Sequence, residues 1–259
     1  MKKVRAKKQL GQHFLEDANI AQQTVDAFGK QHDFSLALEV GPGMGVLTKP
    51  LLQNKKLNVK VIDIDTESIA WLKHEGFLKE DQIIEGDFLK LDLYQLFGEQ
   101  DFGIVGNFPY NISTQILFKA LDYRQQCKEV VGMFQKEVAD RIACKPGSKV
   151  YGITSVLLQA FYDIEYLFTV EPEVFDPPPK VRSAVIRLSR NQVKKLDCDE
   201  KKFQQIVKMA FNQRRKTLRN SLKPLLNDSI KNEAIFADRP EQLSVQQFID
   251  LTNLIAPQH

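Results

Sequence analysis

The stretch LALEVGPGMGVLT, residues 36–48, is the most informative segment for predicting how this chain folds. An apolar run, residues 34–41, leads directly into three glycines, Gly41, Gly43 and Gly45, and then into a segment predicted as a helix. Glycines between a strand and a helix let a ligand approach the backbone at the carboxyl edge of a parallel sheet. Because this turn follows the first core strand, we expect a ligand-binding site at this edge.

Strand-like runs alternate with helical patterns along the first three-quarters of the chain. This alternation is typical of βαβ units and predicts an α/β fold with a mainly parallel sheet. After a predicted helix at residues 155–162, two more strand patterns, 163–170 and 181–188, are candidates for an antiparallel pair at one edge of the sheet. The other predicted strands are residues 34–41, 57–65, 82–88, 102–107 and 129–134.

The character of the sequence changes near Arg190, after which no strand pattern remains. We therefore predict two domains, residues 1–189 with the sheet and residues 190–259 as a small all-helical C-terminal domain. Residues 203–223 have an apolar face of helical period and are predicted to form one helix, which Pro224 ends.

Two basic segments without acids favour a polyanionic partner. Residues 201–223 contain eight Lys or Arg residues and no acid, and no acid precedes Glu16 in the N-terminal segment with Lys2, Lys3, Arg5, Lys7 and Lys8. Helical spacing would place Lys208, Arg215, Arg219 and Lys223 in one stripe that could follow a phosphate backbone. The alternatives are a solvated helix face, or an Arg of the QRRK cluster that packs between the two domains.

Composition and cysteine usage exclude several classes of protein. Hydrophobic residues make up 43% and charged residues 27%, as in soluble globular proteins, and the net charge is only +3. No apolar run approaches the roughly 18 residues of a membrane helix, and no secretory signal follows the basic N-terminus. The three cysteines lack CxxC spacing and the four histidines are scattered. We therefore expect no metal site, no membrane association and a reducing, cytoplasmic location.

The acids around the glycine turn favour a cationic nucleotide ligand. Asp63 ends the next strand, 22 residues after Gly41, where a carboxylate can accept both ribose hydroxyls. No GK[ST] phosphate loop is present, and the third glycine comes one residue early for the dinucleotide fingerprint GxGxxG. Glu39 is unfavourable beside a pyrophosphate but suits a sulfonium and an ammonium, so S-adenosylmethionine is favoured over NAD. Asp87, at the end of the third strand, is either an acceptor for an adenine amine or a helix N-cap.

A second stretch, VGNFPYNIS at residues 105–113, leaves a predicted strand through an amide, a proline and a tyrosine. A turn alone would explain the Asn and the Pro. Beside a methyl donor, the carbonyls of the Asn107 side chain and the Phe108 backbone could bond both hydrogens of an adenine amine and free its lone pair. Pro109 would fix the direction of the Phe108 carbonyl. Tyr110 would stack on the base, and Phe175 is a candidate second ring, unless it is a core residue.

Six motifs, in this order, resemble those of the bacterial small-subunit (16S) ribosomal RNA adenine dimethyltransferases, the dimethyladenosine transferase family. They are KKQLGQHFL (7–15), EVGPGMGVLT (39–48), EGDFLKLD (85–92), GNFPYNIS (106–113), FDPPPKVRSAV (175–185) and FNQRRKTLRNSL (211–222). The resemblance implies a Rossmann-like seven-stranded S-adenosylmethionine-dependent methyltransferase core. It also implies N6,N6-dimethylation of two adjacent adenosines near the 3′ end of the small-subunit rRNA, with S-adenosyl-L-methionine as cofactor and the small ribosomal subunit as partner of a monomeric enzyme.

The same resemblance implies roles for individual residues. The base would be held by Asn107, Phe108, Pro109, Tyr110 and Phe175. The methyl donor would be bound by Gln12, His13, Leu15, Glu39, Gly41, Gly43, Asp63, Ile64, Asp87, Phe88 and Asn107. The rRNA would be bound by Lys7, Lys8, Lys208, Arg214, Arg215, Lys216, Arg219 and Lys223. Two positions depart from the family pattern, because Asp63 stands where Glu is usual and Phe108 where Leu is usual.

Three other functions stay open on the sequence alone. The first is a methyltransferase-like, RNA-binding ribosome assembly factor with little turnover, against which the intact 107–110 stretch argues. The second is a methylase of large-subunit rRNA, and the third is a NAD oxidoreductase. Methyl transfer from labelled donor to immature small subunits would test the first, mapping of the methylated nucleotide the second, and a donor-binding titration the third.

Overall fold

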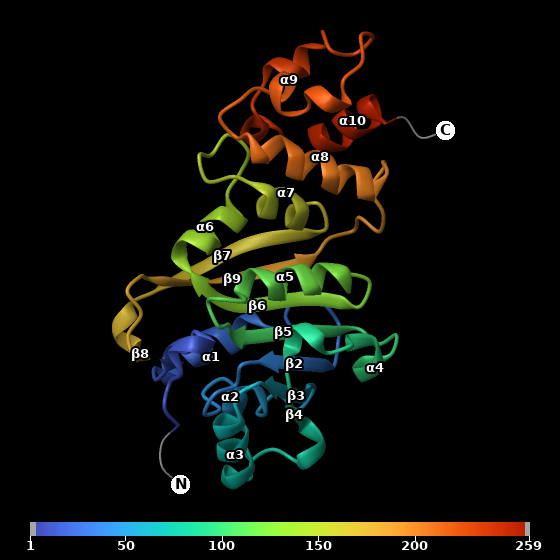
Figure 1. Ribbon diagram of the computed structural model, residues 1–259. Coiled ribbons are helices and arrows are strands. Elements are labelled where there is room, and N and C mark those ends of the chain that lie inside the picture. The colour runs from blue at the N-terminus through green and yellow to red at the C-terminus, as the bar shows by residue number, and fades with distance from the viewer. Residues whose placement is uncertain (1–3, 257–259) are drawn as a thin grey trace. The chain divides into compact units, whose positions relative to one another are not determined.

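The computed structural model describes residues 4–256, so that Lys2, Lys3 and His259 lie outside the described residues (Figure 1). Contacts divide the chain into two compact units. The first comprises Met1–Ala139 and Asp163–Arg190, and the second comprises Asp140–Tyr162 and Asn191–His259. The predicted domain boundary, after residue 189, falls beside one division point, whereas residues 140–162 group with the second unit instead of the first.

The first unit is built on a seven-stranded sheet, as the alternating pattern and the resemblance implied. Its strand order is β4-β3-β2-β5-β6-β9-β7, which can be followed from bottom to top in Figure 1. Strands β4 to β6 are mutually parallel, and β9 runs antiparallel to β6. The strands are β2 (Leu36–Val40), β3 (Asn58–Asp63), β4 (Ile83–Glu85), β5 (Phe102–Asn107), β6 (Cys127–Gln135), β7 (Tyr162–Val170) and β9 (Ser183–Arg190). The two strands predicted for one edge, β7 and β9, are indeed neighbours there.

The register of the parallel strands brings three separate segments together. Val40 pairs with Ile62 across β2 and β3, and Glu39 pairs with Val105 across β2 and β5. The glycine turn that follows Val40 therefore begins beside the ends of β3 and β5. The chain runs from β2 outward through β3 and β4 and then returns to β5 on the other side of β2. The crevice at these carboxyl ends is thus a topological switch point, where ligands bind in open α/β sheets.

Short helices connect the strands, and aspartates cap several of them. Asp17, Asp65 and Asp92 accept backbone N–H groups at the starts of α1, α3 and α4. No helix in residues 4–256 is long and apolar enough to cross a membrane. The helices of this unit are α1 (Ala18–Ala27), α2 (Thr48–Leu51), α3 (Thr66–Glu75), α4 (Leu93–Phe97) and α5 (Ser113–Asp122), with the 3₁₀ helices η1 (Lys8–Leu10), η2 (Glu80–Gln82), η3 (Phe88–Lys90) and η4 (Pro172–Val174). Helix α6 (Lys136–Ala143) spans the division between the units.

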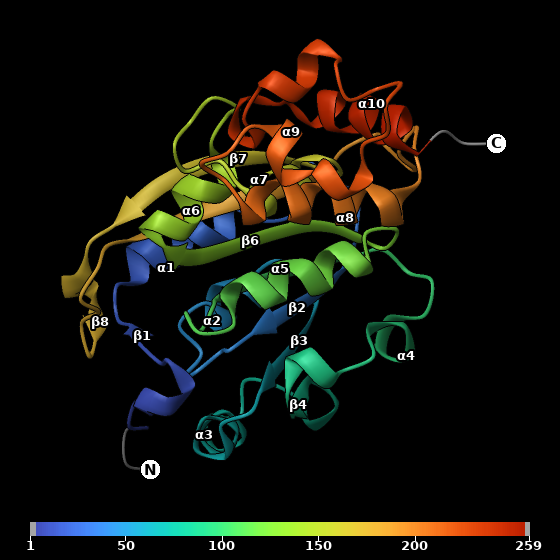
Figure 2. The same cartoon turned by 45° about the horizontal axis from the view of Figure 1, so that its top comes forward.

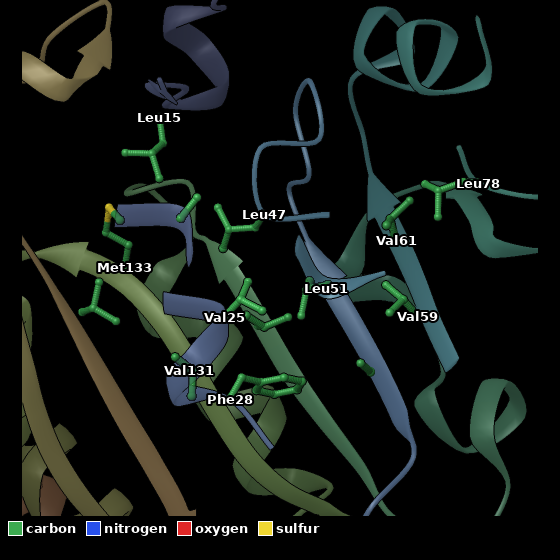
Figure 3. Packing of buried hydrophobic residues seen from close by; sticks show 14 of the residues in the cluster. Leu15, Val25, Phe28, Leu47, Leu51, Val59, Val61, Leu78, Val131 and Met133 are labelled. Carbon is green, nitrogen blue, oxygen red and sulfur yellow. The ribbon is translucent and has the colours of Figure 1, made fainter. Parts of the chain in front are cut away.

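One apolar core joins α1, the glycine turn and the sheet (Figure 3). Burying each aliphatic side chain of such a core contributes about 1.5–3 kcal/mol. Its labelled members are Leu15, Val25, Phe28, Leu47, Leu51, Val59, Val61, Leu78, Val131 and Met133. The core includes Leu15, and so it also holds the N-terminal segment against the sheet.

A two-stranded antiparallel sheet joins the N-terminal segment to the segment before β9 (Figure 2). Strand β1 (Phe14–Leu15) pairs with β8 (Phe175–Asp176), so that Leu15 lies opposite Phe175. This pairing was not predicted. Each strand has only two residues, which is too short for a periodic signal.

The second unit has only helices among its described residues after Asn191, in agreement with the predicted all-helical segment. They are α8 (Glu200–Asn212), α9 (Leu218–Ser221), η5 (Lys223–Leu225), η6 (Ala234–Ala237), η7 (Pro240–Gln242) and α10 (Val245–Ile255), and α7 (Ile153–Gln159) belongs to the same unit.

The prediction of one helix over residues 203–223 is wrong. Helix α8 ends at Asn212, and Gln213 has the non-helical angles φ −118° and ψ 49°. No apolar side chain lies between Phe211 and Leu218 to hold a helix on the core. The backbone N–H of Leu218 donates to the Asp238 carbonyl instead, at 2.8 Å. The basic residues on the two sides of this turn therefore do not form one helical stripe.

Candidate active site

A cavity of about 230 Å³ opens at the carboxyl ends of β2, β3, β4 and β5. Four strand ends and the N-terminal segment contribute to its wall. The lining residues are Leu10 to Phe14, then Val40, Gly41 and Gly43, then Ile62, Asp63 and Ile64, then Gly86 to Leu89, and finally Asn107 to Ile112. The cavity thus lies at the switch point that the glycine turn indicated.

The glycine turn needs its glycines for two reasons. Gly41 and Gly43 have φ values of 73° and 55°, which side chains rarely adopt. A Cβ on Gly43 would also lie 2.9 Å from a ring carbon of Phe14. At Gly43 the group that approaches the turn closely is therefore the N-terminal segment of the same chain. The predicted approach of a ligand stays a prediction.

Asp63 and Ile64 form the wall of the cavity at the end of β3. Asp63 is 9% exposed, and its Oδ1 accepts the backbone N–H of Asp65 at 2.9 Å. Burial raises the pKa of Asp63 to about 6, although this backbone hydrogen bond opposes the shift. Ile64 is 53% exposed and presents an apolar surface beside this carboxylate. A carboxylate with an apolar neighbour suits a ribose and an adjoining base.

Asp87 is a helix N-cap, one of the two interpretations that the sequence allowed, and its role as an acceptor for an adenine amine stays a prediction. It caps η3, because its Oδ1 accepts the backbone N–H of Leu89 at 2.9 Å. It also lines the cavity, together with the buried ring of Phe88. The other carboxylate oxygen of Asp87 lies 3.9 Å from Lys90 Nζ. One oxygen thus fixes the side chain at the start of η3, and the other faces Lys90.

Asn107 ends β5 and enters the cavity with a defined amide orientation. Its Nδ2 donates to the backbone carbonyl of His13 at 2.8 Å. Since the amide nitrogen is engaged in this way, the side-chain oxygen is the acceptor that remains for a ligand. The predicted role of the Asn107 carbonyl requires such an acceptor, and the role itself stays a prediction.

The three residues after Asn107 also line the cavity. The Tyr110 hydroxyl lies 2.5 Å from Ser183 Oγ, and its ring stacks on that of His13, with centroids 5.3 Å apart. Phe108 is only 1% exposed, and its ring packs edge-on against Phe134 at 5.2 Å. The phenyl ring that departs from the family pattern therefore belongs to the core, while the backbone of Phe108 borders the cavity.

Three predicted site residues do not line the cavity. Glu39 is 1% exposed, accepts a hydrogen bond from Thr48 Oγ1 at 2.6 Å, and has its pKa raised to about 8 by burial. Leu15 and Phe175 are buried in the apolar core, where they lie opposite each other in β1 and β8. A stacking role for Phe175 would require its ring to leave this core, so its position agrees with the alternative of a core residue.

Asp65 organises one side of the site, although no sequence pattern singles it out. Its carboxylate accepts from Lys7 Nζ at 2.5 Å and from Gln12 Nε2 at 2.9 Å. Gln12 lines the cavity as predicted, whereas Lys7 is engaged in ion pairs with Asp65 and Glu67. The lining residues Leu10, Gly11 and Phe14 were also missed, and the only sequence signal for them is their position within the KKQLGQHFL motif.

The predicted rRNA contacts of the second unit differ in their surroundings. Arg214 donates to the Lys149 carbonyl within the same unit. The others, Lys208, Arg215, Lys216, Arg219 and Lys223, are exposed, as is Lys8 in the first unit. Lys223 also borders a shallow groove with Met209, Asn212, Gln213, Asn220, Ser221 and Pro224. Arg214 therefore has a structural partner, and the exposed residues are the better candidates for phosphate contacts.

Comparison with known proteins identifies close relatives. The family model described as ribosomal RNA adenine dimethylase matches residues 3–257. A protein of Cytophaga hutchinsonii named ribosomal RNA small subunit methyltransferase A is 60% identical over 257 residues, which cover 99% of both chains. A protein of the same name from Bacteroides fragilis is 56% identical, over 98% of this chain and 94% of its own length.

Solved structures share the fold over almost the whole chain. The crystal structure of a dimethyladenosine transferase from Plasmodium falciparum superposes with a TM-score of 0.76 at 25% identity and covers 92% of this chain and 96% of its own. That of the 23S rRNA methyltransferase ErmE gives a TM-score of 0.67 at 22% identity, with 93% and 99% covered. The latter supports the fold alone.

Proposed function

This chain belongs to the ribosomal RNA adenine dimethylase family and is an rRNA adenine dimethyltransferase of the small subunit, and we propose that it takes its methyl groups from S-adenosylmethionine bound in the cavity. We propose further that the substrates are two adjacent adenosines near the 3′ end of the small-subunit rRNA. The observation that carries the proposal is Asn107, whose amide oxygen remains available in the same cavity as Asp63 and Asp87.

The chemistry of the cavity wall fits S-adenosylmethionine. Asp63 can accept ribose hydroxyls, and Asp87 lies where an adenine amine can donate, with Ile64 and Phe88 as apolar neighbours. None of the described residues that line the cavity is Lys or Arg, so no side chain there matches a pyrophosphate. A cationic, phosphate-free nucleoside therefore suits this wall better than NAD does. Glu39 takes no direct part, since it is buried behind the turn.

The residues at the end of β5 activate the substrate amine. When bound, S-adenosylmethionine supplies a methyl carbon that the adenine nitrogen can attack: the N–C bond forms as the S–C bond breaks, a neutral thioether leaves, and the methylated nitrogen releases one N–H proton to water. The lone pair of this nitrogen is delocalised into the base. The Asn107 side-chain oxygen and the Phe108 carbonyl would each accept one of its hydrogens and favour the tetrahedral geometry of the transition state. Tyr110 would hold the base by stacking, with its hydroxyl fixed by Ser183.

Single-turnover methyl transfer to immature small subunits tests this function. Asn107→Ala should lower the rate by about 10²-fold or more, because its acceptor acts as the amine becomes tetrahedral. Donor affinity, measured by calorimetry, should change by no more than about threefold, since the donor keeps Asp63 and Asp87. Mapping of the methylated nucleotides in the wild-type reaction identifies the substrate. A wild-type protein that binds subunits without transferring methyl groups would instead be an assembly factor.

A further inference from the structure

The N-terminal strap, residues 7–15, runs along the cavity and is fitted closely to it. Five consecutive strap residues, Leu10 to Phe14, line the cavity. Gly11 has a φ of 64°, and a Cβ there would lie 2.8 Å from Asn111 Oδ1. Phe14 approaches Gly43 in the same way at the other end of the strap. The strap thus touches both the glycine turn and the segment after β5.

The first anchor of the strap is a buried carboxylate. The Asp65 side chain is fully buried and accepts from Lys7 Nζ at 2.5 Å, from Gln12 Nε2 at 2.9 Å and from Ser68 Oγ at 3.1 Å. It also caps α3 through the backbone N–H of Glu67 at 3.1 Å. A cap alone needs only backbone donors, as at Asp17. The additional partners indicate that Asp65 holds the strap as well as the helix.

The ion pair between Lys7 and Asp65 persists at neutral pH. Burial alone would raise the pKa of Asp65, but hydrogen bonds from Gln12 and Lys7 hold this pKa below its ordinary value. Removal of Lys7 would leave a buried carboxylate with its main cationic partner gone, which is costly. Gln12 is hydrogen-bonded to the same carboxylate, so a carboxylate that moves or takes up a proton after the loss of Lys7 would displace the strap at this end.

The other end of the strap contacts Asn107 and Tyr110, the residues proposed to hold the adenine. The His13 carbonyl accepts from Asn107 Nδ2 at 2.8 Å, and the His13 ring stacks on Tyr110. An asparagine amide can rotate by half a turn and exchange its oxygen for its nitrogen. Rotation would present an N–H group to the adenine amine, which is itself a donor. The position of the His13 carbonyl therefore decides whether Asn107 offers an acceptor.

We propose that Lys7 and Asp65 are positioning residues for methyl transfer: they hold the strap where the His13 carbonyl keeps the Asn107 amide oxygen directed at the adenine amine. The inference rests on the proposed role of Asn107. It assigns to Lys7 a function inside the enzyme, in place of the rRNA contact that its charge suggested.

Lys7→Met tests the proposal, with Lys49→Met as the matched control. Lys49 pairs with Glu75 at the other end of the same helix α3, at 3.7 Å, and does not touch the strap. With donor and small subunits both saturating, Lys7→Met should lower the single-turnover rate by about 10–100-fold, the effect of displaced reacting groups. Lys49→Met should stay within about twofold of wild type, and Lys7→Arg should recover most of the rate because it restores the ion pair. The unfolding midpoint of each variant is measured alongside.

The same substitution in an Asn107→Asp variant tests whether Lys7 acts through the Asn107 amide. Asn107→Asp keeps an oxygen but cannot donate to the His13 carbonyl, so in that variant Lys7→Met should lower the remaining rate by less than about twofold. An equal loss in both backgrounds overturns the proposal. The proposal is also overturned if Lys7→Met has the saturated rate of the wild type but binds subunits or donor more weakly. Lys7 would then act only in binding. An inactive wild type contradicts the proposed function itself, whereas a Lys7→Met variant with the saturated rate of the wild type contradicts this inference alone.

Discussion

The protonation state of Asp63 decides what the β3 side of the cavity can bind. Only the ionised carboxyl offers all of its oxygen lone pairs to hydroxyl donors such as those of a ribose. Burial raises the pKa of Asp63 to about 6, so the group changes charge near the lower end of the physiological range. Hydroxyl donors favour the carboxylate, and ligand binding should therefore lower this pKa. By linkage, affinity must then fall as the pH drops through the pKa of the free protein.

We expect the affinity for S-adenosylmethionine to be constant above about pH 7 and to fall by up to tenfold per pH unit below about pH 6. Asp63→Asn should bind the donor more weakly and should lack this pH dependence. Isothermal calorimetry across the range measures both proteins. His13 and Asp87 also line the cavity, so the comparison with Asp63→Asn is what assigns the effect. The same pH profile in the variant would show that another group is responsible.

Residue by residue, the sequence predicted the site residues at strand ends and missed those whose roles depend on tertiary partners. Asp63, Asp87 and Asn107 lie at or just after the ends of strands, and parallel register brings such residues together without further information. Glu39 lies inside its strand instead, so its side chain is buried beside Thr48 and away from the cavity. Asp65 could not be singled out, because its role depends on where Lys7 lies, 58 residues earlier.

At the level of elements, two glycines in the paired strands β5 and β6 leave space for one aromatic ring. Gly106 and Gly132 are paired neighbours in these strands, and both border the ring of Phe108. A Cβ on Gly132 would lie 2.0 Å from a ring carbon of Phe108, and one on Gly106 would lie 2.5 Å from the Val40 carbonyl. The space over Gly132 is therefore occupied by the ring of Phe108, a residue that also lines the cavity.

We expect Gly132→Ala to destabilise the protein by about 1–3 kcal/mol, because the ring must move to relieve overpacking. It should also slow methyl transfer, since displacement of Phe108 shifts its carbonyl. Adding Phe108→Leu, the residue usual in the family, should recover part of both losses. Urea unfolding and single-turnover rates measure the effects. Gly152→Ala is the control, because its nearest neighbour would be 3.9 Å away. If Gly132→Ala destabilises the protein equally with and without Phe108→Leu, the ring of Phe108 is not what the added methyl group collides with.

The elements that sequence could not predict are those fixed by distant partners. Apolar runs in the sequence were enough to predict β2 to β6, and four of these strands carry a buried run of their own, whereas β4 is only partly buried. The β1–β8 pair joins Leu15 to Phe175 through two-residue strands, which no local pattern identifies. The helix predicted over residues 203–223 failed for a related reason, since the backbone of Leu218 is bound by Asp238 from a later segment.

At the scale of the whole molecule, the charge distribution separates structural from candidate RNA-binding residues. Lys7 and Arg214 have partners within their own units, and these contacts explain them without RNA. Arg215 and Arg219 are exposed, one in the turn after α8 and the other in α9. They no longer belong to one helical stripe, but phosphate contact requires only accessible charge. Contacts of this kind position an RNA without reading its sequence.

We expect Arg215→Glu with Arg219→Glu to weaken binding to small subunits and to flatten its dependence on salt. Each phosphate contact contributes about 0.7–0.9 to the slope of log affinity against log salt, so loss of two should lower the slope by about 1.4–1.8. Lys55→Glu with Lys56→Glu, at exposed positions before β3, changes the net charge equally and serves as the control. Binding measured across a salt series separates a local phosphate contact from a general charge effect. A general charge effect lowers the slope in both variants, whereas a local contact lowers it only in the variant with both arginines replaced. Donor affinity should be unchanged in both variants, since all four positions lie outside the cavity lining. Equal slopes in the two variants would mean that the exposed arginines of the second unit do not touch phosphate.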